Sequence, residues 1–63
     1  MTIKELTREQ LITVKQYYLA TKKEKAGQGV SYGELAEADT LITDAEIFDA
    51  YQDTEFSEGD FDA

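Results

Sequence analysis

Carboxylates are the most numerous reactive side chains of this sequence, which contains no histidine and no cysteine. Glu34 with Glu37, or Asp49 with Asp53, would share a helix face, where two acids can act as general acid and base. Such a pair also needs a cleft that holds substrate, and acids at this density usually form a solvated surface. Because the commonest general base and the strongest nucleophile are missing, we expect that the protein is not an enzyme.

Metal and cofactor motifs are incomplete. If Gly59 were the glycine of a calcium-binding loop, Thr54, Phe56 and Glu58 would occupy ligand positions, and phenylalanine cannot bind a metal. The segment Gly27-Gln28-Gly29 follows a predicted helix, whereas a dinucleotide-binding loop lies between a strand and a helix. We interpret this segment as a turn and predict no metal and no cofactor.

Charge is distributed unevenly along the 63 residues, whose net charge is −8. The first 25 residues contain all six basic residues and three acids, whereas residues 26–63 contain eleven acids and no base. With these acids unpaired, we expect the surface of residues 34–62 to bind a basic patch on another protein. The same field repels polyanions, so direct binding of nucleic acid is not expected.

Two forms of this binding hypothesis compete with a third alternative. The protein could be an adaptor whose Phe56 and Phe61 dock in an apolar groove rimmed with Lys and Arg, or its carboxylates could imitate DNA phosphates and inhibit a nucleic-acid-binding protein. Alternatively, the acids only keep a small domain soluble. The candidate partner-binding residues are Tyr17, Glu34, Glu37, Asp49, Asp53, Glu55, Phe56, Glu58, Asp60 and Phe61.

A long amphipathic helix over residues 8–26 is expected to position these residues. Thr7 and Gln10 have the spacing of a capping box, and Leu11, Val14 and Tyr18 recur at helical spacing. Tyr17 lies at the edge of this apolar band, where tyrosine often contributes to binding surfaces. Gly27 supplies the residue type that most easily closes a helix.

Two further caps, Ser31 with Glu34 and Thr43 with Glu46, predict helices near residues 32–39 and 44–52. The predicted fold is therefore all-α, a small three-helix domain in residues 1–52 with a flexible acidic C-terminal tail in residues 53–63. The tail could instead dock Phe56 on the core. The predicted core residues are Leu11, Val14, Tyr18, Leu35, Ile47, Phe48 and Tyr51, while residues 1–5 are unassigned except that Ile3 could cover the first helix.

The run from Ser31 to Leu35, the run from Ile42 to Phe48 with Tyr51, and the closing Phe56 and Asp60-Phe61 resemble small acidic hypothetical proteins of mobile elements in gut bacteria. The resemblance covers about the last half of the chain and implies a bacterial accessory protein without an assigned activity. Residues 31–36 are also similar to a capped helix start in DNA alkyltransferases, whose reactive cysteine is missing here.

Small size limits the stability of the isolated chain, because a domain of this length buries about 60% of the surface that its unfolded chain exposes. We expect either low stability or a weak homodimer formed through the first helix. No apolar run approaches the length of a membrane span, and the first residues lack the apolar core of a signal peptide. A cytoplasmic protein without membrane partners is therefore expected.

Overall fold

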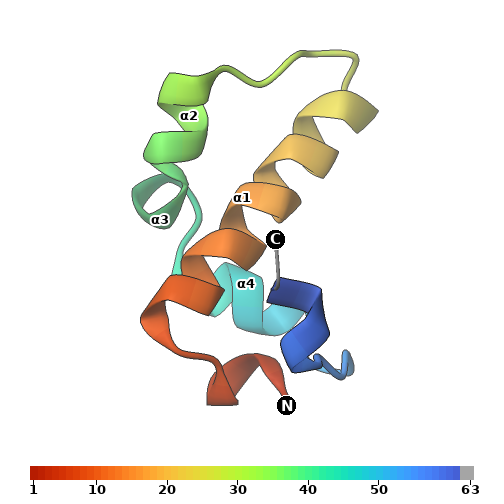
Figure 1. Ribbon diagram of the computed structural model, residues 1–63. Coiled ribbons are helices and arrows are strands. Elements are labelled where there is room, and N and C mark those ends of the chain that lie inside the picture. Colours follow the sequence, from red (N-terminus) through yellow and green to blue (C-terminus); the bar gives the residue numbers. More distant parts are fainter. Residues whose placement is uncertain (62–63) are drawn as a thin grey trace.

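Helices make up the ordered elements of the computed structural model, which describes residues 1–61 and shows no strand among them. Their order is η1 (Ile3–Glu5), α1 (Arg8–Lys25), α2 (Tyr32–Ala36), α3 (Ala38–Leu41), α4 (Asp44–Ala50) and η2 (Glu58–Phe61), where η denotes a 3₁₀-helix. In Figure 1, α2 and α3 lie along one flank of α1, and α4 lies with η1 and η2 near the beginning of α1. The all-α prediction is confirmed, with four α-helices in the described residues where three were predicted.

Helix α1 begins and ends with the predicted signals. The Thr7 hydroxyl accepts a hydrogen bond from the Gln10 amide at 3.2 Å, and the Gln10 side chain accepts one from the Thr7 amide at 3.0 Å. At the other end Gly27 has φ 75°, and the Gln28 amide donates to the Lys23 carbonyl at 2.8 Å. This is a Schellman motif, in which a left-handed glycine lets the chain turn back while the last carbonyls stay bonded.

The second predicted helix is divided in two, so the expectation of one helix over 32–39 is wrong. The chain leaves helical geometry at Glu37, which has φ −99° and ψ 6° and lies between α2 and α3. After this turn Ala38 and Ile42 are 0% and 3% exposed. The change of direction buries both side chains, which favours the break over a continuous helix.

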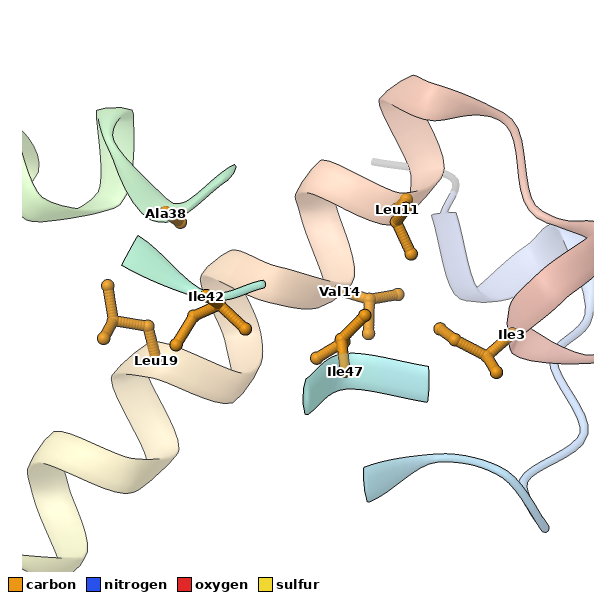
Figure 2. Packing of buried hydrophobic residues seen from close by; sticks show 7 residues of the cluster. All are labelled: Ile3, Leu11, Val14, Leu19, Ala38, Ile42 and Ile47. Carbon is orange, nitrogen blue, oxygen red and sulfur yellow. The ribbon is translucent and has the colours of Figure 1, made fainter. Parts of the chain in front are cut away.

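The core lies between α1, α3, α4 and η1 and is shown in Figure 2. Leu11, Val14 and Ile47 are buried as predicted, and Tyr18, Phe48 and Tyr51 are half-buried against them. Leu35 is half-buried and does not belong to this cluster. The other buried apolar residues are Ile3, Leu19, Ala38 and Ile42. Ile3 of η1 belongs to the same cluster as Leu11 in the first turns of α1, as one alternative anticipated.

Residues 53–61 pack on the same core. The Phe56 amide donates to the Met1 carbonyl at 2.7 Å, and the Met1 ammonium donates to the Phe56 carbonyl and the Glu55 carboxylate, each at 2.6 Å. Phe56 and Phe61 are half-buried against the core. The sequence allows two interpretations of this segment, a flexible tail or a docked Phe56. The structure shows the docked Phe56, and residues 53–61 do not form a flexible tail. Residues 62–63, the rest of the predicted tail, lie outside the described residues.

Among residues 1–61, no helix combines the length and the apolar character that crossing a bilayer requires.

Candidate functional site

A charge cluster of Arg8, Lys15, Asp39 and Asp44 joins α1 to α3 and α4. Lys15 is 1% exposed, and its ammonium donates to Asp39 Oδ1 at 2.9 Å, to Asp44 Oδ1 at 2.6 Å and to the Asp39 carbonyl at 3.2 Å. Arg8 also contacts both carboxylates, Asp39 through Nη2 and Asp44 through Nη1 at 3.3 Å. Two bases therefore hold two acids from separate elements in one position.

The pKa values of this cluster follow from its contacts. Hydrogen bonds from Arg8 and then Lys15 lower the pKa of Asp39 to about 2. The hydrogen bond from Lys15 likewise lowers the pKa of Asp44. Burial by itself lowers the pKa of Lys15, but the hydrogen bonds to Asp44 and Asp39 outweigh it and raise that pKa above its ordinary value. All four groups are thus charged near neutral pH.

Lys15 was not among the residues that sequence reasoning selected. Its position contained a signal, since it lies midway between Leu11 and Leu19 at intervals of four residues. Residues at that spacing share one helix face, and both leucines are buried. A lysine within an apolar stripe requires an acid opposite it.

Three more acids of the second half of the chain have basic partners. Glu34 pairs with Lys23 at 3.0 Å, Glu46 pairs with Lys22 at 3.4 Å, and Glu55 pairs with the N-terminal ammonium at 2.6 Å. The sequence predicts that the eleven acids of residues 26–63 are unpaired. This prediction is wrong for five of them, namely Glu34, Asp39, Asp44, Glu46 and Glu55. Folding places basic α1 against the acidic elements, so opposite charges far apart in sequence meet.

Five acids remain exposed and without an ion-pair partner in the described part of the second half of the chain. They are Glu37, Asp49, Asp53, Glu58 and Asp60. Each was a candidate partner-binding residue, whereas the candidates Glu34 and Glu55 are occupied within the fold. The eleventh acid of this half, Asp62, lies outside the described residues.

Five of the predicted residues meet around a hollow of about 380 Å³, here called the aromatic hollow. Tyr17 of α1, Tyr51, Phe56 and Phe61 contribute rings to its lining, and Glu55 and Asp60 contribute carboxylates. The Phe56 ring lies 5.8 Å from the Tyr51 ring and 6.0 Å from the Phe61 ring, measured between centroids. Tyr17 is 69% exposed, so a partner can reach this wall.

The remaining candidates are dispersed. Glu34 and Glu37 lie in α2 and the turn after it, Asp49 lies in α4, and Asp53 and Glu58 lie in the segment that follows; none of them lines the aromatic hollow. Their positions differ because the chain turns between α2, α3 and α4. The predicted acidic surface is therefore spread over several elements, and of its described acids Glu55 and Asp60 line the hollow.

Glu34, one of the acids considered for catalysis, is held by neighbouring residues of the fold. Glu34 accepts hydrogen bonds from the amide and hydroxyl of Ser31, and its pKa is lowered, chiefly by Lys23. A carboxylate held in this way is a poor general base. Within residues 1–61, no group of three or more acids has the arrangement of a metal site.

Comparisons with protein families, with curated proteins and with solved structures found no match to this chain. The aromatic hollow and the exposed acids of the second half of the chain are therefore the features from which a function is inferred.

Proposed function

We propose that the protein acts by binding, through the acidic surface of its second half, to a basic surface of another protein. The observation that supports this proposal is how the acids are divided. In the described residues, the fold pairs five acids of this half with bases and leaves five exposed ones without an ion pair. Carboxylates without a basic partner repel one another, and binding to a basic protein surface relieves that repulsion.

The aromatic hollow favours the adaptor form of this hypothesis over DNA mimicry. A mimic needs negative charge, whereas an aromatic surface among acids is typical of a protein interface, in which apolar anchors are surrounded by a polar rim. The adaptor proposed here differs from the one expected from the sequence in the role of Phe56 and Phe61. Phe56 and Phe61 pack on the core of this chain, so we propose that they form a receiving surface and do not project into the partner.

The test is affinity capture from a lysate of the organism that carries the sequence, followed by calorimetry with each captured protein in purified form. The variant Asp49→Asn/Asp53→Asn removes two exposed acids from the proposed surface. The matched control Glu9→Gln/Glu24→Gln removes two exposed acids from α1 that have no ion-pair partner in residues 1–61. Point variants are preferable to a chain ending at Gln52, because that truncation would also remove Phe56 from the core.

We expect the first variant to weaken binding of a basic partner by about tenfold at low salt, with a smaller effect at high salt. The control should weaken it by less than about threefold. Capture of DNA-binding proteins that depends equally on both pairs of acids would favour the mimic. If the unmodified chain binds nothing at low salt, the binding hypothesis is wrong and solubility explains the acids.

A further inference from the structure

The aromatic hollow offers the faces of several aromatic rings, which the exposed acids alone do not provide. Its rings come from α1, from the residue after α4 and from the C-terminal segment, so three parts of the chain must fold together to form it. Tyr51 and Phe56 line it and contact each other, as do Phe56 and Phe61. The faces of such rings carry partial negative charge.

Carboxylates lie beside these rings. Asp60 lines the hollow and uses Oδ2 to accept a hydrogen bond from the Ser57 amide at 2.8 Å. It has no ion-pair partner in residues 1–61, so its charge is not neutralised there. Glu55 also lines the hollow but is engaged by the N-terminal ammonium. Asp60 is therefore the carboxylate available to a ligand.

The bases of this chain do not supply that ligand. Within the described residues Lys4 and Lys25 are the two bases without an ion pair, and neither lines the hollow. An apolar side chain placed there would take Asp60 out of water without compensation. A cation with a long apolar stem satisfies both the rings and the carboxylate.

We propose that the aromatic hollow binds an arginine side chain of the partner protein. Arginine fits better than lysine because its planar guanidinium stacks on aromatic faces and binds a carboxylate through two parallel hydrogen bonds. Its stem lies against Phe56 and Phe61, and its guanidinium lies between the Tyr17 ring and Asp60. This inference rests on the proposed function and names the anchor residue of the basic partner.

The test uses the full chain, labelled with ¹⁵N, and three probes: acetyl-Gly-Arg-Gly-amide and the same tripeptide with lysine or with citrulline at the centre. Citrulline keeps the shape of arginine without its charge. We expect the arginine probe to shift the amide resonances of Tyr17, Phe56, Asp60 and Phe61 in NMR spectra. Its dissociation constant should be about threefold below that of the lysine probe and at least about tenfold below that of the citrulline probe.

Two variants and one matched control locate the binding. Asp60→Asn should weaken the arginine probe by about fivefold, and Tyr17→Ala should weaken it by about threefold. Glu24→Gln removes the same charge from an exposed residue of α1 that does not line the hollow and should change the affinity by less than about 1.5-fold. Spectra of the free variants, unchanged away from the substituted residue, establish that each one is folded.

The results separate this inference from the proposed function. Equal weakening by Asp60→Asn and Glu24→Gln, or equal binding of the citrulline probe, would show that the hollow has no specific role. The proposed function would still stand if basic proteins bind the acidic surface. Shifts of the hollow that grow with protein concentration and without any probe would make a second copy of the chain the occupant and overturn the proposal. If the arginine probe binds as expected while the lysate yields no basic partner, the hollow is established and the proposed function fails.

Discussion

Lys15 is the residue whose surroundings differ most from what its type suggests. Its ammonium contacts two carboxylates that are 34% and 48% exposed, so Lys15 is buried directly beneath the surface part of the charge cluster. Burying a lysine costs free energy, and the three hydrogen bonds that it donates compensate for this cost.

The first prediction concerns the removal of that charge. Lys15→Met keeps most of the apolar stem but leaves Asp39 and Asp44 facing each other with Arg8 alone. We expect the free energy of unfolding to fall by about 2 kcal/mol. Lys25→Met is the control, because Lys25 is exposed and has no ion pair within residues 1–61. Urea unfolding followed by circular dichroism measures both, and equal stability of the two variants would contradict the prediction.

The second prediction is a loss of stability in acid. The pKa of Asp39 is about 2 in the folded chain, below its ordinary value, so the unfolded chain binds more protons between about pH 4 and pH 2. The contribution of Asp39 to the free energy of unfolding is therefore complete above about pH 4 and is lost as the pH decreases toward 2. The lowered pKa of Asp44 acts in the same direction.

Melting temperatures measured from pH 5 to pH 2 test this dependence. Asp39→Asn removes the titrating group, so this variant should lose less stability over the interval than the unmodified chain. It should also be less stable at pH 5, because the asparagine cannot form the ion pairs. A variant with the same acid sensitivity as the unmodified chain would show that other groups dominate.

At the scale of elements, short helices obtain their stability from caps and from packing. Helix α4 has seven residues, fewer than an isolated helix needs in water. The Thr43 hydroxyl accepts a hydrogen bond from the Glu46 amide at 3.1 Å, which forms half of the predicted capping box. The Glu46 carboxylate instead meets Tyr18 and then Lys22, and both lower its pKa. Contacts with α1 thus replace the local bond.

The third prediction compares two glycines of the turn that follows α1. Gly27 has φ 75°, and a methyl group placed on it would have no neighbour within 4 Å. Gly27→Ala should therefore lower the free energy of unfolding by about 1 kcal/mol through backbone strain alone. Gly29 has the same open surroundings without a positive φ, so Gly29→Ala should be neutral or slightly stabilising. Equal effects in urea unfolding would argue against the Schellman motif.

At the scale of the whole molecule, one small core joins η1, α1, α3 and α4, and η2 packs on it through Phe61. The chain has a radius of gyration of 11.5 Å, and Leu11 is 6% exposed in the core formed with Ile3, Val14 and Ile47. A core of this size has little redundancy.

The fourth prediction is therefore a large effect of one truncation. Leu11→Ala should lower the free energy of unfolding by about 2 to 5 kcal/mol, which is enough to unfold a marginal domain. Leu41→Ala is the matched control, since Leu41 is 48% exposed and should cost less than about 1 kcal/mol. An unchanged melting temperature for Leu11→Ala would contradict the observed core.

The fifth prediction decides between low stability and a homodimer through α1. Within α1, Tyr17 is the one large apolar side chain that is mostly exposed, and a single residue offers far less area than a stable interface needs. We therefore expect a monomer of low stability. Sedimentation equilibrium at increasing concentration, with Tyr17→Ala as a comparison, tests this. A dimer that Tyr17→Ala dissociates would establish the alternative.

Local patterns were sufficient to predict a large part of this fold. The boundaries of α1, the caps at Thr7 and Ser31, the closing glycine and the burial of Leu11, Val14 and Ile47 all depend on residues a few positions apart. Such interactions occur within one helix, so spacing and side-chain type determine them. Five of the predicted binding residues also line one hollow.

Tertiary structure alone decided the features that depend on residues distant in sequence. The break at Glu37 occurs where Ala38 and Ile42 become buried. The ion pairs of Lys15 with Asp39 and Asp44 span 24 and 29 positions. The hydrogen bond between Met1 and Phe56 spans 55 positions. The sequence determined how many acids follow α1, but the packing of α1 against α3 and α4 determined which of them are neutralised. Ion pairing depends on distances below about 4 Å, and only folding brings distant residues that close together.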